Sequence, residues 1–297
     1  MRRFTIDESD VQKRLDIFVA ENLPEVSRAY VRKLYEMGSV EVNDEPAKLS
    51  YKLKAGDRIS IDYEPSSIEH TPDIELPILY EDGECVVINK PTGLLTHSKG
   101  SFNPEATVAT WFNQRLGTVK ELNKVSREGI VHRLDRGTSG VMILAKTPEA
   151  MSWLQKQFST RKVKKTYIAI VVGELNPTEA VIDMPIERNP RRPQTFRVGS
   201  HGKPSKTHYK VLKVVNYHGS VISLVELKPE TGRTHQLRVH LKQQGHPIIG
   251  DSFYDGRLAD RLYLHARDLE LTLPNKERRV FSAKLPKEFD NYLENLK

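Results

Sequence analysis

Residues 129–146 read Gly-Ile-Val-His-Arg-Leu-Asp-Arg-Gly-Thr-Ser-Gly-Val-Met-Ile-Leu-Ala-Lys, and this stretch decides how the larger part of the chain is interpreted. Two apolar runs are typical of β-strands, and the polar, glycine-punctuated segment between them is typical of a loop. The loop carries one carboxylate, Asp135, among the basic side chains of His132, Arg133 and Arg136. The pattern therefore predicts two strands joined by a loop that presents a single acid.

Asp135 admits two interpretations from the residues alone. Neighbouring positive charges favour the ionised form of a carboxylate, and a fixed, ionised carboxylate serves as a nucleophile or a base. An ordinary hairpin loop, whose aspartate makes local hydrogen bonds, fits the same charge pattern. The charge pattern leaves both interpretations open.

The order of residues in this loop is similar to a known signature. His132-Arg133-Leu134-Asp135, followed by Thr138-Ser139-Gly140 and a strand ending Ala145-Lys146-Thr147, resembles the signature loop of the RluA/RluD family of RNA pseudouridine synthases. The resemblance implies that Asp135 is the catalytic residue. Gly137 stands where the family often has aspartate, which removes a local hydrogen bond but leaves the catalytic position in place.

Composition and charge exclude several classes of protein. A chain of 297 residues with 38% hydrophobic and 29% charged residues is long enough for two domains and typical of a globular protein. It has no run of 18 apolar residues and no signal-like N-terminus, so we expect a cytoplasmic protein without a membrane segment. Cys85 is the single cysteine, which excludes an internal disulfide and a multi-cysteine zinc site. The net charge of +7 suits a polyanionic partner without requiring one.

The first fifth of the chain predicts a compact module of two helices, over residues 11–22 and 27–38, and short strands near 40–43 and 58–63. The module resembles the alpha-L RNA-binding domain named for the fourth protein of the small ribosomal subunit. This resemblance implies recognition of RNA shape, with the basic face of the second helix meeting phosphates. Arg28, Arg32 and Lys33 form that face. An ordinary solvated helix face fits these three residues equally well.

Three regions follow from the composition. Residues 65–77 carry three prolines and are typical of a linker, which separates residues 1–64 from residues 78–297. The resemblance implies that the first region is an alpha-L domain and the last a catalytic domain. Helical patterns at 107–116, 147–160 and 286–297 alternate with apolar strands in the last region. The fold class is α+β: the small domain is followed by a larger mixed, mostly antiparallel β-sheet flanked by helices and loops, the latter inferred from the family resemblance.

A second motif lies in the apolar strand predicted over residues 165–173. A tyrosine at the head of a strand is usually a packing residue. The spacing Lys-x-Tyr-x-Ala-x-Val-x-Gly, however, resembles the second motif of the synthase family, which implies that Tyr167 stacks on the target base and takes its proton. The polar, Arg/Pro-rich residues 186–210 are expected to lack regular structure, and they resemble the arm with which the family grips RNA.

The third motif, over residues 231–241, reads Thr-Gly-Arg-Thr-His-Gln-Leu-Arg-Val-His-Leu. Gly232 permits a tight turn, after which we expect a helix to begin near Thr234. As structure alone, Arg233 fits an interface ion pair. The family resemblance implies that Arg233 pairs with the catalytic Asp135 and fixes its direction.

The three motifs occur in the family's order across nearly the whole chain, and they imply isomerisation of uridine to pseudouridine in structured RNA. Asp135 would act on a flipped-out uridine as nucleophile or base, and Arg133 would occupy the vacated place. The reaction needs no cofactor and no metal, and His235 and His240 are spaced five apart, which does not suit a helical metal site. We expect a monomer acting on large-subunit ribosomal RNA. Transfer RNA is the alternative substrate, and a non-catalytic ribosome assembly factor is the alternative of another class.

Overall fold

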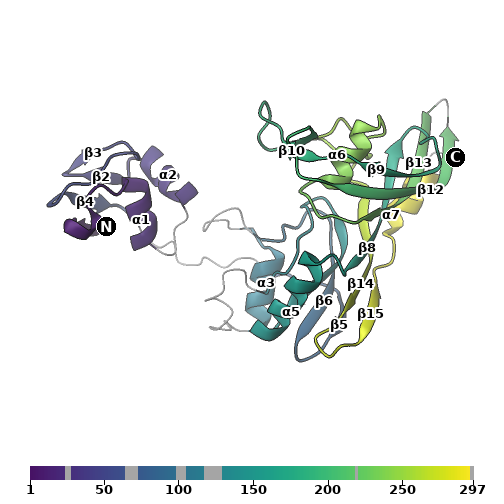
Figure 1. Cartoon of the computed structure of the whole chain (residues 1–297), viewed down its shortest axis with the longest axis horizontal. Coiled ribbons are helices and arrows are strands. Elements are labelled where there is room, and N and C mark those ends of the chain that lie inside the picture. Colours follow the sequence, from purple (N-terminus) through teal and green to yellow (C-terminus); the bar gives the residue numbers. More distant parts are fainter. Residues whose placement is uncertain (24–27, 64–72, 98–104, 117–128, 218–219, 295–297) are drawn as a thin grey trace. The chain divides into compact units, whose positions relative to one another are not determined.

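The computed structural model describes residues 1–23, 28–63, 73–97, 105–116, 129–217 and 220–294. The chain divides into two compact units, residues 1–73 with 97–106 and residues 74–96 with 107–297 (Figure 1). Both units mix helices and strands, which confirms the α+β class. The predicted limits of the domains and the linker stay predictions, because most of the linker lies outside the described residues. No described helix combines the length and apolar character needed to cross a bilayer.

The N-terminal unit packs two helices against a four-stranded antiparallel sheet with the strand order β1-β4-β2-β3. Its core combines apolar side chains of both helices and of the sheet, among them Leu15, Val31 and Ile59. The elements in chain order are β1 (Arg2–Thr5), the 3-10 helix η1 (Glu8–Asp10), α1 (Leu15–Asn22), α2 (Arg28–Glu36), β2 (Val40–Val42), β3 (Glu45–Pro46) and β4 (Arg58–Ile61).

The first helix is shorter than the predicted range 11–22. Gln12 has a φ of +67°, in the left-handed region, and a right-handed helix cannot pass through such a residue. The helix therefore begins at Leu15. The second predicted helix corresponds to α2, and it is followed by Gly38 with a φ of +72°, the conformation in which helices commonly end.

The larger unit is built on a nine-stranded sheet in the described part of the chain, with the order β5-β6-β7-β14-β8-β13-β12-β9 and β15 paired to β14. All its pairs are antiparallel except β7 with β14. The strands are β5 (Ile78–Glu81), β6 (Cys85–Lys90), β7 (Ser139–Ala145), β8 (Lys164–Val172), β9 (Glu179–Asp183), β12 (Lys206–Tyr217), β13 (Ser220–Pro229), β14 (Leu264–Thr272) and β15 (Arg278–Ser282).

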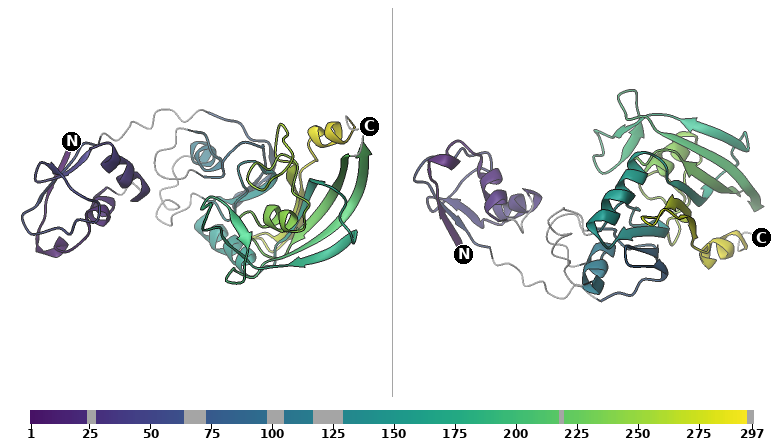
Figure 2. Two further views of the ribbon diagram at one scale, coloured as in Figure 1. Left: turned by 90° about the horizontal axis from the view of Figure 1, so that it is seen from above. Right: turned by 60° about the horizontal axis from the view of Figure 1, so that its bottom comes forward.

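Helices cover both faces of this sheet. Alternate residues of β6 and β7 point to opposite faces, and α3 (Val108–Leu116) packs on one face while α5 (Pro148–Ser159) packs on the other. Thr147 caps α5 by accepting a hydrogen bond from the backbone N–H of Ala150, as its sequence predicts. The strands β8, β13 and β12 curve around α6 (Gln236–Gln243), as Figure 2 shows.

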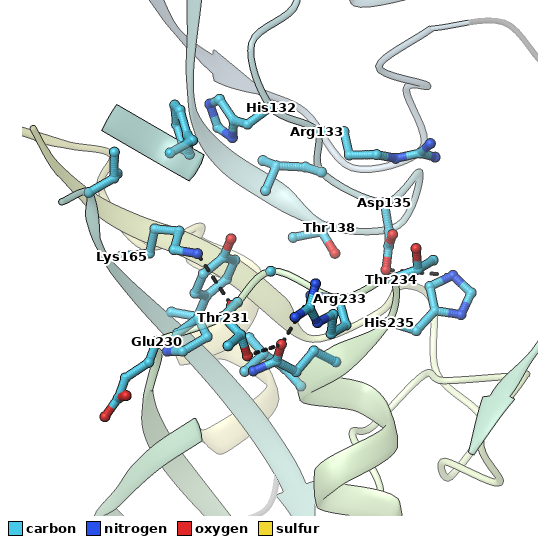
Figure 3. Close-up of a pocket in the computed structure, with 18 of the residues that line it drawn as sticks. His132, Arg133, Asp135, Thr138, Lys165, Glu230, Thr231, Arg233, Thr234 and His235 are labelled. Atoms are coloured by element: carbon cyan, nitrogen blue, oxygen red, sulfur yellow. Dashed lines mark hydrogen bonds and ion pairs between the residues drawn. The ribbon is translucent and has the colours of Figure 1, made fainter. Parts of the chain in front are cut away.

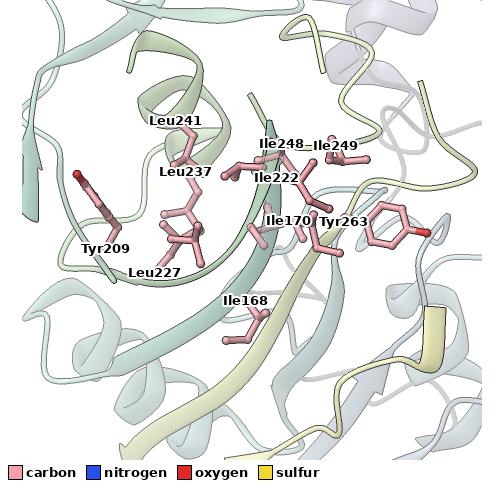
Figure 4. Close-up of a cluster of buried hydrophobic side chains, with 14 of the residues drawn as sticks. Ile168, Ile170, Tyr209, Ile222, Leu227, Leu237, Leu241, Ile248, Ile249 and Tyr263 are labelled. Atoms are coloured by element: carbon pink, nitrogen blue, oxygen red, sulfur yellow. The ribbon is translucent and has the colours of Figure 1, made fainter. Parts of the chain in front are cut away.

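The largest apolar core lies where α6 meets these curved strands. Leu237 and Leu241, one turn apart on α6, point toward the strands that carry Ile170, Ile222 and Leu227 (Figure 4). Phe289 and Leu293 of the C-terminal helix α7 (Lys287–Glu294) belong to the same cluster. The core thus fixes the start of α6 against the sheet, and this is the segment that carries the third motif.

Residues 186–210 are more regular than expected from their composition. Residues of β10 (Ile186–Arg188) and β11 (Phe196–Val198) pair as an antiparallel hairpin, and β12 already begins at Lys206. Gly202 packs directly against the backbone of Ile186, where a Cβ would approach within 2.6 Å. The expectation of an arm without regular structure was wrong, because backbone pairing compensates for the scarcity of apolar side chains.

Candidate active site

A cavity of about 690 Å³ brings the three motifs of the larger unit together. Its wall includes residues 131–135 of the first motif, Lys165 and Tyr167 of β8, and residues 229–238 of the third motif. Figure 3 shows Asp135 directed toward His235 on one side of this cavity, with Lys165 on the opposite side. Segments more than 90 residues apart in sequence therefore share one pocket.

The loop that carries Asp135 is held by the turn that follows β6. The N–H of Gly93 donates to the carbonyl of Arg136 at 2.8 Å, and the hydroxyl of Thr92 donates to the carbonyl of Gly137 at 2.8 Å. The ammonium of Lys90 donates to three carbonyls, those of Pro91 (2.9 Å), Leu94 (2.8 Å) and Arg136 (3.3 Å). These bonds fix the backbone directly after Asp135.

The close approach of β7 to β14 explains why residue 140 of the first motif is a glycine. Gly140 has a φ of +121°, and a Cβ there would lie 2.1 Å from the carbonyl oxygen of Ala266. Any other residue would push β7 away from β14 at the point where the Asp135 loop enters the sheet. Gly140 of the motif is therefore a packing requirement of the sheet.

Arg238 is the residue that pairs with Asp135. Its Nη1 donates to Asp135 Oδ2 at 3.1 Å, while Nε and Nη2 bind both carboxylate oxygens of Asp251 at 2.7 and 2.8 Å. The side chains of Arg238 and Asp251 are 8% and 0% exposed, so Asp251 holds the guanidinium in one orientation. Burial opposes the charge, but hydrogen bonds to Asp251 and the charges of both aspartates raise the pKa of Arg238.

The expectation that Arg233 pairs with Asp135 was wrong. Arg233 lies in the turn before α6, where its Nε donates to the carbonyl of Pro204 at 3.2 Å. The helix begins at Gln236, two residues later than expected, because the side chain of Gln236 accepts from the N–H of Arg233 and from the hydroxyl of Thr231. This capping keeps residues 231–235 in a turn and places Arg238, one helical turn further on, opposite Asp135.

His235 is a pocket residue to which the sequence analysis gave no role. Its Nε2 lies 3.8 Å from Asp135 Oδ2, and its Nδ1 lies 2.8 Å from the hydroxyl of Tyr254. The Tyr254 hydroxyl also accepts from the N–H of Phe196 at 2.9 Å, which ties the His235 ring to the β10–β11 hairpin. Burial lowers the pKa of His235, so the ring is neutral at pH 7 and its Nε2 faces Asp135.

Tyr167 and Lys165 share one face of β8 and line the pocket opposite α6. Burial, followed by the charge of Asp135, raises the pKa of the Tyr167 hydroxyl, so it stays a phenol at neutral pH. Burial lowers the pKa of Lys165 to about 8, and its Nζ makes one long hydrogen bond of 3.4 Å to the carbonyl of Thr231. Both residues line the pocket wall, and few described residues compete with a ligand for their hydrogen bonds.

Two of the three basic neighbours of Asp135, His132 and Arg133, differ in their surroundings. His132 Nε2 accepts a hydrogen bond from the N–H of Ile143 at 3.1 Å, and its ring stacks on Phe158 with centroids 4.5 Å apart. Burial lowers the pKa of His132 to about 3, so this ring is a neutral support for the loop. Arg133 also lines the cavity, and its side chain is exposed.

The RNA-binding residues predicted in the N-terminal unit are described only in part. Arg32 is exposed on α2 and forms an ion pair with Glu36 one turn later, at 3.0 Å. The side chains of Arg28 and Lys33 lie outside the described part of the structure. An exposed pair of this kind contributes little to stability, so Arg32 is available to exchange Glu36 for another anion.

Comparison with known proteins accounts for both units. Residues 84–243 match the model of the RNA pseudouridylate synthase family, and residues 13–59 match the S4 domain model. An uncharacterized RNA pseudouridine synthase of Aquifex aeolicus is 41% identical over 249 residues, covering 82% of this chain and 77% of that protein. Ribosomal large subunit pseudouridine synthase D of Nitrosomonas europaea is 37% identical over 285 residues, covering 91% and 80%.

Solved structures agree with the sequence matches. Human RNA pseudouridylate synthase domain containing 1 superimposes with a TM-score of 0.59 at 30% identity, covering 79% of this chain and 89% of that one. The resemblance inferred from the three motifs and from the N-terminal module is thereby confirmed. The chain belongs to the RNA pseudouridylate synthase family and carries an N-terminal S4 domain.

Proposed function

We propose that this enzyme converts specific uridines of large-subunit ribosomal RNA into pseudouridine, and that Asp135 acts on the sugar of a flipped-out uridine. One observation carries the assignment of Asp135. Arg238 donates to Oδ2, the same oxygen that His235 faces, whereas no donor to Oδ1 is recorded among the described residues. One carboxylate oxygen is thus held and the other is available to react.

The chemistry of the reaction needs a single acid. The bond from the anomeric carbon to N1 of uracil breaks, the base turns within the pocket, a bond from the anomeric carbon to C5 forms, and C5 loses its proton. Asp135 either attacks the anomeric carbon or removes the proton at the 2′ carbon to give a glycal. Glycosidases use two carboxylates because they must activate water, whereas here the base itself returns.

The pocket residues support the remaining steps. Arg238, held by Asp251, keeps the direction of Asp135 while the base turns. Tyr167 offers its aromatic face and a neutral hydroxyl to the uracil, in keeping with its raised pKa. Arg133, exposed at the pocket rim, is positioned to enter the gap that the uridine leaves in its helix.

The choice of ribosomal RNA is supported by the relatives. Several related proteins are named ribosomal large subunit pseudouridine synthase C or D, at 32–37% identity. An S4 domain and a net charge of +7 suit a structured RNA substrate. Transfer RNA and a role as a non-catalytic assembly factor are the alternatives that the experiment must separate.

The test is release of tritium from RNA labelled at C5 of uracil, on unmodified ribosomal and transfer RNA in parallel. We expect the wild-type enzyme to act on ribosomal RNA, and Asp135→Asn to lower turnover by more than about 10³-fold while RNA affinity and folding are retained. Asp255→Asn is the matched control, because Asp255 is 68% exposed and asparagine tolerates its φ of +58°.

Each outcome decides one part of the proposal. Tritium release from transfer RNA alone would show that transfer RNA is the substrate. No release from either RNA, with intact RNA binding, would favour the assembly factor. Unfolding of Asp135→Asn would make the residue structural. Deuterium at the 2′ carbon slows the reaction only if Asp135 removes that proton, so this substitution separates the two mechanisms.

A further inference from the structure

A second hollow, of about 480 Å³, adjoins the candidate active site. Gly232, Arg233 and Thr234 line both cavities, so the turn before α6 forms their common wall. The opposite wall consists of the β10–β11 hairpin and the turn that follows it, with the lining residues Ile186, Glu187, Arg188, Phe196, His201, Gly202 and Lys203. The second hollow therefore lies next to the first, across this turn.

The second hollow is positively charged. Arg188, Lys203 and Arg233 contribute three cations from three separate segments. The acid in its lining, Glu187, is engaged by Arg197, whose Nη2 lies 2.8 Å from Glu187 Oε1. The remaining balance of charge favours an anionic ligand.

The donors of Arg233 are suited to such a ligand. Its Nε is used by the carbonyl of Pro204, and no partner is recorded for the terminal Nη1 and Nη2 among the described residues. This bond fixes the direction of the side chain while leaving the outer edge of the guanidinium for another acceptor. A planar guanidinium with two parallel donors matches the oxygens of a phosphate.

The hollow is held in shape by bonds to the catalytic pocket. The N–H of Phe196 donates to the Tyr254 hydroxyl, which in turn contacts His235 beside Asp135. The Phe196 and His235 rings also meet edge to face, with centroids 5.7 Å apart. The hairpin is therefore fixed relative to the acid that acts on the uridine.

We propose that this second hollow binds the phosphodiester of the nucleotide next to the target uridine, through Arg188, Lys203 and Arg233. The proposal rests on the proposed function, because it takes the first cavity as the uridine site. A flipped-out uridine leaves its neighbouring phosphates exposed as single-stranded RNA. Holding one of them beside Asp135 fixes how deeply the sugar enters the pocket.

The experiment compares Arg188→Ala, Lys203→Ala and Arg233→Gln with Lys213→Ala. Lys213 is exposed on β12, lines neither cavity, and its removal changes the net charge as Lys203→Ala does. We expect the three hollow variants to raise KM for RNA about 5- to 20-fold with kcat within about 2-fold. In direct binding, a variant that combines all three substitutions should lower the slope of log affinity against log salt by about 0.7, the value for one single-strand phosphate contact, and each single variant should lower it by a part of that value. The control should leave KM, kcat and slope at their wild-type values.

A modified RNA identifies the phosphate itself. A neutral methylphosphonate is placed on the 5′ or the 3′ side of the target uridine, and binding of each RNA is measured with wild type and with Arg188→Ala. Where the methylphosphonate replaces the phosphate that Arg188 binds, Arg188→Ala should bind the modified RNA as tightly as the wild type does. The proposal is overturned if neither position shows this coupling, or if Lys213→Ala weakens binding as much as Lys203→Ala. Binding is measured without turnover, so this result is separate from the failure or success of the synthase assignment.

Discussion

Lys90, behind the Asp135 loop, and Lys165, in the wall of the pocket, are two buried lysines with opposite surroundings. Burial lowers the pKa of both, to about 7 for Lys90 and to about 8 for Lys165. Among the described residues, the Lys90 ammonium donates to three carbonyls, whereas Lys165 donates to one, over a long distance. Lys90 thus serves as an anchor for the loop, whereas Lys165 keeps donor capacity for a ligand in the cavity.

This difference shows which buried charge is structural. Lys90 is 0% exposed, and its ammonium donates to three carbonyls at 2.8 to 3.3 Å, so these carbonyls depend on it for a partner. Burial disfavours the charge of both lysines, but Lys165 has one long hydrogen bond among the described residues, so its cost is not matched by an anchoring role. A costly donor that faces a substrate cavity is typical of a functional group.

The substitution with the largest expected effect is Lys90→Met, which tests whether Lys90 anchors the Asp135 loop. The change leaves three carbonyls without their donor and frees the backbone next to Asp135. We expect about 2 kcal/mol less stability in urea unfolding and about 10²-fold lower kcat in the tritium assay, because a displaced acid loses its alignment.

Thr92→Val provides the graded comparison for Lys90→Met. It removes one bond to the same loop, from the Thr92 hydroxyl to the carbonyl of Gly137, and should reproduce a fraction of the loss. A Lys90→Met enzyme with wild-type stability and kcat would contradict the role of Lys90 as an anchor.

Lys165→Met tests the other side of the comparison and should have the smaller effect on turnover. We expect kcat/KM to fall about tenfold, because the donor opposite Asp135 is lost. Stability at pH 7 should rise, because the substitution removes a charge that burial disfavours and leaves only one carbonyl of the described residues, that of Thr231, without its donor. Unfolding in urea measures this gain, and a destabilised variant would show that Lys165 is an anchor like Lys90.

Much of the fold could be predicted because its signals are local. The cap at Thr147, the apolar alternation of β8 and the glycine after α2 each act within a few residues, and each predicted its element. The β10–β11 hairpin could not be predicted from its polar composition, because its pairing depends on the register of two backbones. The left-handed Gln12 has no clear signal, since glutamine rarely adopts that conformation.

The candidate site could be located but not fully assigned. The motifs placed Asp135 and Tyr167 correctly in one pocket, whereas the choice between Arg233 and Arg238 depended on where α6 begins. Both arginines line the pocket, but the later helix start leaves Arg233 in the turn and gives the contact with Asp135 to Arg238. Asp251 and Tyr254 lie outside the three motifs in sequence and contact Arg238 and His235 only in the folded chain. The spacing of residues within the motifs therefore does not predict their part in the site.

The two lysines should also differ in the pH at which each begins to change the free energy of unfolding. In the unfolded chain both lysines keep their proton up to a pH near 10.5, whereas in the folded enzyme Lys90 loses it near 7 and Lys165 near 8. In these intervals the unfolded chain holds more protons, so the free energy of unfolding rises with pH, by up to about 1.4 kcal/mol per unit for each lysine.

We therefore expect the free energy of unfolding of the wild type, minus that of Lys90→Met, to begin rising near pH 7. The same difference taken with Lys165→Met should stay nearly level until about pH 8 and rise above it. Urea unfolding at pH 6.5, 7.5, 8.5 and 9.5 measures both curves, and other titrating groups cancel in each difference. If the two curves rose together, or in the reverse order, the two lysines would not differ in the way that their hydrogen bonds and burial indicate.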